Sequence, residues 1–264
     1  MTDLYAVIGN PVAHSKSPMI HAEFARLTHQ DMDYSAVLSP LDGFAGTVES
    51  LRKEGYKGCN VTVPFKQEAW KISTTLSPRA SLAESVNTLK FEDEQIFGDN
   101  TDGAGLVNDI LKNLGHELAG KRILLLGAGG AARGVIAPLL DCKPLELVIA
   151  NRTLEKAAEL ATKFPILPKS FEALSGSRFD IVINATSSGL KDELPPIPQG
   201  LFAKGSLAYD MMYGMRTPFM KFAEVQGASI ISDGLGMLVE QAAESFFVWR
   251  GVRPETKGVI EKLR

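Results

Sequence analysis

The run R-I-L-L-L-G-A-G-G-A-A at residues 122–132 constrains the fold of this chain more than any other segment. Residues 123–126 are continuously apolar, which is typical of a β-strand covered on both faces in a parallel sheet. Gly127, Gly129 and Ala132 follow with G-x-G-x-x-A spacing and lead into a helix-like segment. A strand, a glycine turn and a helix in this order begin a βαβ unit, so the run predicts an α/β fold with a parallel sheet.

The rest of the chain also alternates between strand-like and helix-like segments. We expect strands at residues 4–9, 34–38, 58–63, 123–126, 147–150, 180–184 and 207–210, and a hairpin of 88–92 with 95–98. We expect helices at residues 41–54, 102–114, 235–250 and 254–263, and a helix that Ser17 caps and Pro18 begins. The 264 residues then divide into two α/β domains, residues 1–101 with 237–264 and residues 102–236.

The glycine turn predicts a site for the phosphates of a dinucleotide. Gly127 permits the tight turn, Gly129 lets the backbone approach a pyrophosphate, and Ala132 is small enough for the helix to pack on the strand. The phosphates would lie on the free N–H groups of the helix N-terminus. The motif alone is a weak signal, and an ordinary glycine-rich turn without a ligand is the alternative, but a second strand follows at the expected distance.

The end of that second strand indicates which dinucleotide is bound. NAD sites usually place an acid there, whereas this chain has Asn151-Arg152-Thr153, and its first acid is Glu155. A charge-assisted contact from Arg152 to a 2′-phosphate would contribute about 1.5–3 kcal/mol, which favours NADP roughly 10- to 150-fold. The alternative is a solvated surface arginine at the start of a helix.

A nicotinamide cofactor implies hydride transfer, which needs a partner that takes up or gives a proton. The segment N-V-T-V-P-F-K at residues 60–66 alternates with a period of two. As an extended chain it would turn Val61, Val63 and Phe65 into a core, and Asn60, Thr62 and Lys66 to a polar face. A partly desolvated lysine near a cofactor can exchange a proton near neutral pH, so Lys66 is a candidate for this role. Taken alone, it could equally be a surface lysine.

Other polar clusters suit a small polyhydroxylated acid. Ser15 and Ser17 precede a helix N-terminus, where a carboxylate is favoured, although Ser17 could be a simple cap. G-D-N-T-D-G at residues 98–103 carries two aspartates, including Asp102, and could equally be a capped turn. V-N-T-L places Asn87 before a strand.

Composition excludes several other classes of protein. The net charge of −3 gives no electrostatic reason to expect nucleic acid or a membrane as a partner. No apolar run approaches the roughly 18 residues of a membrane span, and the N-terminus lacks the basic flank of a signal peptide. The two cysteines show no disulfide or metal spacing, so we expect a reducing cytoplasm and no metal site. Monomer and homodimer both remain open.

Taken together, these motifs resemble those of the shikimate dehydrogenases over nearly the whole chain. The shared motifs, in order, are G-N-P-V-A-H-S-K-S-P, N-V-T-V-P-F-K, S-V-N-T-L, G-D-N-T-D-G, G-A-G-G-A-A, N-R-T, I-N-A-T-S-S-G, Y-D-M-M-Y and D-G-L-G-M-L-V-E-Q-A. The resemblance implies a substrate domain and a Rossmann-type NADP domain flanking a cleft. It also implies reduction of 3-dehydroshikimate to shikimate by NADPH, a step of aromatic amino-acid synthesis.

The resemblance also implies a role for each matching residue. The catalytic pair would be Lys66, which transfers the proton of the 3-hydroxyl, and Asp102, which orients that hydroxyl; the reverse assignment is open because coupled groups share their titration. The substrate would be held by Ser15 and Ser17 at its carboxylate, by Thr62, Asn87 and Gln241 at its hydroxyls, and by Tyr213 close by. NADP would be held by Gly127, Ala128, Gly129, Gly130, Ala131, Asn151, Arg152, Thr153, Thr186, Met211 and Gly234.

Three alternatives remain at this stage. The first is a quinate/shikimate dehydrogenase that uses NAD. Arg152 argues against NAD as its cofactor, but does not exclude quinate as a substrate. A non-enzymatic NADP sensor on the same scaffold would not need both Lys66 and Asp102. A two-domain dehydrogenase acting on a folate would leave Asn87 and Gln241 unexplained.

Overall fold

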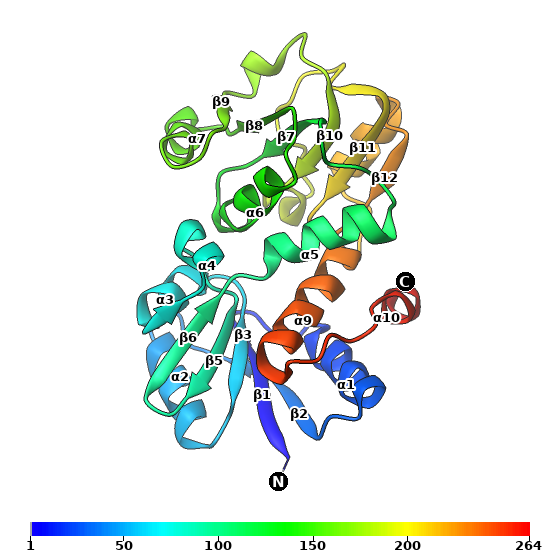
Figure 1. Ribbon diagram of the computed structural model, residues 1–264. Coiled ribbons are helices and arrows are strands. Elements are labelled where there is room, and N and C mark those ends of the chain that lie inside the picture. Colours follow the sequence, from blue (N-terminus) through cyan, green and yellow to red (C-terminus); the bar gives the residue numbers. More distant parts are fainter. Residues whose placement is uncertain (1) are drawn as a thin grey trace. The chain divides into compact units, whose positions relative to one another are not determined.

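The computed structural model describes residues 2–264. The chain divides into two compact units, the first running up to Gly105 and including Leu238–Arg264, the second being Leu106–Met237. Each unit is built around its own six-stranded sheet (Figure 1). The expected α/β class is confirmed, while the roles expected of the two units stay predictions.

The first unit contains a mixed sheet with the strand order β2-β1-β3-β5-β6-β4. Its strands are β1 (Asp3–Gly9), β2 (Met32–Leu38), β3 (Gly58–Val61), β4 (Thr75–Leu76), β5 (Thr88–Glu92) and β6 (Gln95–Asp99). Its helices are α1 (Ser17–Thr28), α2 (Phe44–Lys53), α3 (Lys66–Ile72), α4 (Pro78–Ala83), most of α9 (Leu235–Arg250) and α10 (Lys257–Leu263). β1 pairs in parallel with β2 and β3, whereas β5 is antiparallel to β3 and forms the expected hairpin with β6.

Alternation along β1 separates the two cores of this unit. Ala6 and Ile8 pack against apolar residues of α2, α3 and α4, whereas Tyr5 packs against α1, α9 and α10. A strand turns successive side chains to opposite faces, so both faces of this sheet are covered by helices.

The segment at residues 60–66 differs from the extended strand that its alternation predicts. β3 ends at Val61, the N–H of Phe65 donates to the carbonyl of Thr62 (3.0 Å), and α3 begins at Lys66. Pro64 has no N–H with which to continue the ladder, so the chain turns here. The expected core position of Val63 is therefore wrong: its side chain is 64% exposed.

A buried histidine lies in the core between β2 and the helices α1 and α9. His21 is fully buried and stacks on Tyr34, with ring centroids 4.2 Å apart, and on Phe246. Burial disfavours the charged imidazolium and lowers the pKa of His21 from 6.5 to about 3.

This histidine should make the stability of the protein depend on pH. Below pH 6.5 the unfolded chain binds a proton that folded His21 refuses down to about pH 3. The free energy of unfolding should therefore fall with decreasing pH across this window, by about 1.4 kcal/mol per pH unit. We expect His21→Phe to remove this contribution, measured by denaturant unfolding at several pH values. The exposed His29, replaced by asparagine, serves as the control; equal slopes for wild type and His21→Phe would contradict the account.

The second unit contains an all-parallel sheet with the strand order β12-β11-β10-β7-β8-β9. Its strands are β7 (Arg122–Leu126), β8 (Glu146–Ala150), β9 (Leu167–Lys169), β10 (Phe179–Asn184), β11 (Phe202–Asp210) and β12 (Ile230–Ser232). Its helices are the last part of α5 (Asp102–Asn108), which begins in the first unit and continues here as a π-helical turn (Asp109–Asn113), α6 (Gly130–Asp141), α7 (Leu154–Ala161) and α8 (Pro218–Val225). Short 3₁₀ turns lie at Glu172–Leu174 and Ser188–Lys191.

Strand β7 occupies the centre of this sheet and explains the apolar run at residues 123–126. Ile123 and Leu125 pack with α6 and α7 on one face, and Leu124 and Leu126 pack with α8 on the other. The strand order reverses between β7 and β10, because β8 lies on one side of β7 and β10 on the other. Ligands of open α/β sheets bind at the carboxyl ends of the strands at such a reversal.

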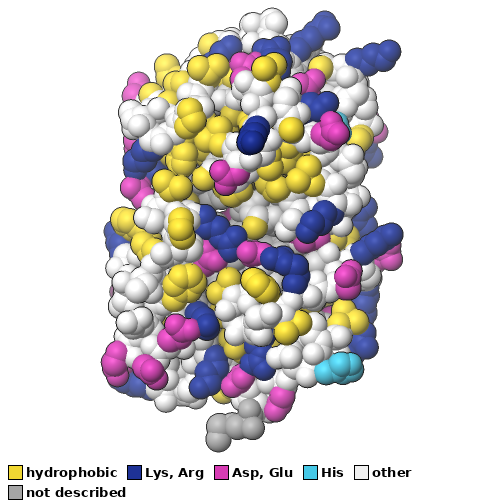
Figure 2. Space-filling view, viewed as in Figure 1, with side chains coloured by type: hydrophobic (Ala, Val, Ile, Leu, Met, Phe, Trp, Pro, Cys, Tyr) yellow, Lys and Arg dark blue, Asp and Glu magenta, His cyan; other side chains and the backbone are white. Residues whose placement is uncertain are grey.

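The face of the surface in view carries charges of both signs. Figure 2 shows positive and negative side chains interspersed there. Of the helices in residues 2–264, none has the length and apolar character needed to cross a membrane.

Candidate functional site

The structure brings Lys66 and Asp102 together in the first unit. Lys66 is the first residue of α3 and Asp102 the first residue of α5. The Nζ of Lys66 donates to Oδ2 of Asp102 at 2.6 Å. The Asp102 side chain is 7% exposed and that of Lys66 21%, so the pair is largely desolvated but still accessible to a small molecule.

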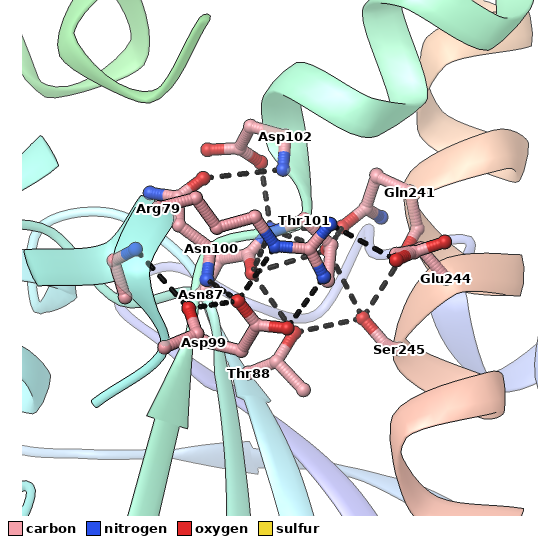
Figure 3. Close-up of polar contacts among 12 residues, drawn as sticks. Arg79, Asn87, Thr88, Asp99, Asn100, Thr101, Asp102, Gln241, Glu244 and Ser245 are labelled. Carbon is pink, nitrogen blue, oxygen red and sulfur yellow. Dashed lines mark hydrogen bonds and ion pairs between the residues drawn. The ribbon is translucent and has the colours of Figure 1, made fainter. Parts of the chain in front are cut away.

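Asn87 lies next to the Asp102 carboxylate and also contacts Gln241 (Figure 3). The buried Nδ2 of Asn87 donates to Oδ1 of Asp102 (2.8 Å), to Oε1 of Gln241 (3.1 Å) and to Oγ1 of Thr101 (3.0 Å). The amide of Asn87 thus links three predicted residues, Asn87 itself, Asp102 and Gln241. The ion pair with Asp102 adds the fourth, Lys66.

The polar residue Asn60 has a structural role. Its Nδ2 donates to the carbonyl of Asn87 (3.1 Å) and to Oγ of Ser245 (2.9 Å), and its Oδ1 accepts from the hydroxyl of Tyr34 (2.7 Å). These bonds occupy its amide within the core, so its expected place on an open polar face is wrong.

Ser15 and Ser17 differ from the expected cap. Lys16 occupies the N-cap position of α1 and Ser17 is its first residue. The N–H of Ser17 instead donates to Oγ of Ser15 (3.3 Å), so Ser15 stabilises the entry to the helix. Within residues 2–264, neither serine makes a hydrogen bond to Lys66 or Asp102.

Thr62 depends on a glycine that sequence reasoning overlooked. Its N–H donates to the carbonyl of Ile8 (2.9 Å), which holds it beside the end of β1. A Cβ on Gly9 would lie 2.4 Å from Cγ2 of Thr62. Gly9 therefore allows Thr62 to approach, and its signal was the glycine that ends the first predicted strand.

The loop after β7 is shaped for a phosphate ligand. Gly127 has φ +102, a conformation that favours glycine, and its N–H donates to the carbonyl of Ala150 (2.8 Å). Gly129 is the N-cap of α6, and a Cβ at Gly129 or Gly130 would find no atom within 4 Å. The open space beside these two glycines leaves room for a ligand, which fits a pyrophosphate at the helix N-terminus. Ala128 and the fully buried Ala132 pack beneath the loop with the core, and Ala131 lies half-buried in the first turn of α6.

The end of β8 presents Arg152 to solvent. Nδ2 of Asn151 donates to the carbonyl of Thr153 (2.8 Å), which closes the turn before α7. Arg152 is exposed, and it makes no ion pair in the part of the chain that the structure describes. Its guanidinium is therefore available to an anionic ligand.

Three further predicted cofactor residues meet at the carboxyl ends of β10 and β11. The Oγ1 of Thr186 donates to Oδ1 of Asn184 (2.7 Å), and the N–H of Met211 donates to the Asn184 carbonyl (3.0 Å). A Cβ on Gly234 would lie 2.3 Å from the carbonyl oxygen of Met211, and one on Gly127 would lie 3.3 Å from Cγ2 of Thr186. The glycine loop and the expected nicotinamide side are thus contiguous.

Two residues near this position were not singled out from the sequence. Asn184 and Asp210 are buried, and Nδ2 of Asn184 donates to Oδ2 of Asp210 (3.1 Å). Burial raises the pKa of the Asp210 carboxyl. Tyr213 lies half-buried just beyond, and burial raises the pKa of its hydroxyl. Asn184 and Asp210 could have been identified from the sequence only through the family motifs I-N-A-T and Y-D-M.

A parallel sheet with a phosphate loop at its reversal point, in a chain that also carries a lysine–aspartate pair, defines a dinucleotide-dependent oxidoreductase. Family profiles name the particular group. The shikimate dehydrogenase substrate-binding domain matches residues 7–89, the shikimate/quinate 5-dehydrogenase profile residues 109–191, and the shikimate 5′-dehydrogenase C-terminal domain residues 234–264. The chain belongs to the shikimate dehydrogenase family.

Individual relatives agree with this assignment. The chain is 61% identical to the shikimate dehydrogenase (NADP(+)) of Nitrosospira multiformis, covering 100% of this chain and 98% of the relative. It resembles the structure of an Ael1 enzyme from Pseudomonas putida, with a TM-score of 0.94 and 49% identity over 99% of this chain and 98% of that chain. It also resembles the shikimate 5-dehydrogenase of Thermus thermophilus in complex with NADP(H) and shikimate, with a TM-score of 0.89 and 34% identity over 98% of both chains.

Proposed function

We propose that this chain is an NADP-dependent shikimate dehydrogenase, which reversibly reduces 3-dehydroshikimate to shikimate in aromatic amino-acid synthesis. The observation that carries the proposal is the ion pair between Lys66 and Asp102, 2.6 Å long, in a chain of this family. Oxidation of an alcohol needs a hydride acceptor and a group that takes the hydroxyl proton. NADP supplies the first when bound, and the pair supplies the second.

In this proposal Lys66 moves the proton. Its Nζ is accessible at the start of α3, whereas the Asp102 carboxylate is more deeply buried. As the neutral amine, Lys66 takes the proton of the 3-hydroxyl when shikimate is oxidised, and as the ammonium it returns that proton in the reverse direction. Asp102 accepts a hydrogen bond from the same hydroxyl and keeps the ammonium in place; the reverse assignment is distinguished only by kinetics.

The remaining unit 1 residues hold the substrate. Ser15 and Ser17 bind its carboxylate at the entrance to α1, where backbone N–H groups favour an anion. Thr62, Asn87 and Gln241 bind ring hydroxyls. The hydrogen bond between Asn87 and Gln241 (3.1 Å) supports this, because it gives the two amides a fixed relative orientation. Tyr213, from the loop after β11 in the second unit, is the remaining residue proposed to bind substrate.

The second unit holds NADP, and the first holds the substrate. The loop Gly127–Ala131 cradles the pyrophosphate, and the open space beside Gly129 supports this role. Arg152, between Asn151 and Thr153, pairs with the 2′-phosphate. Thr186, Met211 and Gly234 line the nicotinamide. The proposed compartment is the cytoplasm, and the proposed assembly is a monomer or homodimer.

A four-way rate comparison on the purified protein tests the function. Shikimate or quinate is paired with NADP or NAD, and nicotinamide absorbance is followed. We expect shikimate with NADP to exceed every other pair by about a hundredfold. The charge-assisted contact of Arg152 accounts for the margin over NAD, and not for the margin over quinate. Comparable rates with quinate or NAD would indicate the broader quinate/shikimate activity. No turnover in any pair, with NADP still bound, would replace the enzyme by a nucleotide sensor.

A further inference from the structure

A partly buried group of charges lies beside the turn that carries Asp102, and the proposed reaction gives it no role (Figure 3). Arg79 on α4 donates from Nε and Nη2 to the two carboxylate oxygens of Asp99, at 2.7 and 2.5 Å. Its third nitrogen, Nη1, lies 2.9 Å from Oε1 of Glu244 on α9. One guanidinium therefore connects the end of β6 with a helix that is distant in sequence.

Asp99 is held more tightly than an ordinary loop residue. Its side chain is 4% exposed and also accepts from Oγ of Ser77 (2.5 Å) and from the N–H of Asn100 (2.7 Å). Burial alone would raise the pKa of Asp99, but the bonds from Arg79 and Ser77 lower it, so the carboxylate stays charged. A charge in this position is costly unless every partner is in place.

The fixed carboxylate determines the path of the turn to Asp102. Asn100, next along the chain, donates from Nδ2 to the carbonyl of Ser85 (2.9 Å) and accepts from the N–H of Asp102 at Oδ1 (3.2 Å). The N–H of Thr101 donates to Oδ1 of Asn87 (2.9 Å). A continuous series of hydrogen bonds thus leads from Asp99 to Asp102.

The other arm of Arg79 leads to a second substrate-binding side chain. Glu244 lies three positions after Gln241 on α9, so the two are neighbours on one face of the helix. Fixing Glu244 fixes the rotation of this helix, and with it the direction of Gln241 toward Asn87.

We propose that Arg79 is a positioning residue for the proposed reaction: by joining Asp99 to Glu244 it sets Asp102 against Lys66 and holds Gln241 in register. The inference rests on the proposed function. The planar fork of arginine makes both contacts at once, whereas the single ammonium of lysine does not. Lysine keeps the charge in place, so Arg79→Lys tests geometry and not charge.

The test compares Arg79→Lys with wild type in kcat, in KM for shikimate and in the pH profile of kcat/KM. We expect kcat to fall about tenfold or more and KM for shikimate to rise, because the reacting groups lose alignment. The pH profile should shift, because a displaced Asp102 no longer couples to Lys66 as before. Affinity for NADP, which is proposed to bind the other unit, should stay within about twofold.

Arg250→Lys is the matched control. Arg250 also joins α9 to the sheet of this unit through an aspartate, Asp3, and through Gln30 (2.8 Å), but none of its bonds reaches the 99–102 turn. It should lower the melting temperature without moving the pH profile. If the role of Arg79 were purely structural, Arg79→Lys would behave like this control. A pH profile and kcat of Arg79→Lys equal to those of Arg250→Lys would therefore overturn the proposal.

Two further variants keep the test open if Arg79→Lys does not fold. Asp99→Asn should reproduce the loss in kcat, whereas Glu244→Gln, which disturbs only the α9 arm, should mainly raise KM for shikimate. Equal effects of both variants on kcat and KM would overturn the proposal. Hydrogen exchange at the N–H of Asp102 should also quicken in Asp99→Asn without any substrate present. If the wild-type protein showed no turnover, the proposed function itself would be overturned. This outcome distinguishes a failure of the proposed function from a failure of the positioning role of Arg79.

Discussion

Replacing Lys66 with alanine should lower kcat for shikimate oxidation by about 10²- to 10⁴-fold, the usual contribution of a general acid–base group. The loss follows from the geometry, because Nζ of Lys66 is the cation that lies 2.6 Å from the Asp102 carboxylate. Shikimate affinity should change little, since the proposed contacts of its ring hydroxyls with Thr62, Asn87 and Gln241 are not altered. Steady-state kinetics at saturating NADP, together with calorimetric titration of shikimate, measures both quantities.

Lys71→Ala provides the control for this prediction. Lys71 lies exposed in the last turn of the same helix, α3, so its removal takes away a charge without touching Asp102. We expect wild-type turnover from it. If Lys66→Ala also stays within a few-fold of wild type, the proton must move by another route.

The charge reversal Arg152→Asp should reduce kcat/KM for NADP by at least about 10- to 150-fold, while kcat/KM for NAD changes little. Arg152 is exposed at the end of β8, where an acid would repel the 2′-phosphate and instead suit a free ribose hydroxyl. The two cofactors are compared at a fixed shikimate concentration and ionic strength.

An exposed arginine at the other end of the sheet separates local from general electrostatics. Arg178 precedes β10 at its amino end, so Arg178→Asp makes the same change in net charge far from the phosphate loop. It should leave the preference for NADP intact. Equal losses with NADP and NAD in Arg152→Asp would mean that this residue does not recognise the phosphate.

The second unit was the more predictable part of the fold. Strands that are buried on both faces are apolar without interruption, so residues 123–126 and 147–150 identified β7 and β8 directly. The phosphate loop was predictable because only glycine adopts the backbone of Gly127 easily. Strands of two or three residues, such as β4, β9 and β12, leave too short a pattern for any periodicity to be detected.

The contacts among the candidate site residues could not be predicted from the sequence. The alternation at residues 60–66 could not distinguish a long strand from a strand, a turn and a helix start, so Val63 and Asn60 were misplaced. Ser17 was expected to cap α1, because serine often does so. In the structure the N–H of Ser17 instead donates to Oγ of Ser15. Arg79 carried no signal, because its partners Asp99 and Glu244 are brought near only by the tertiary fold.

The most direct measurement is a single turnover with shikimate that carries deuterium at C3, with mass spectrometry of the recovered cofactor. The account predicts one deuterium in each molecule of reduced NADP, and the same transfer at a lower rate in Lys66→Ala. Reduced NADP without deuterium would contradict hydride transfer from the 3-position, and with it the proposed reaction.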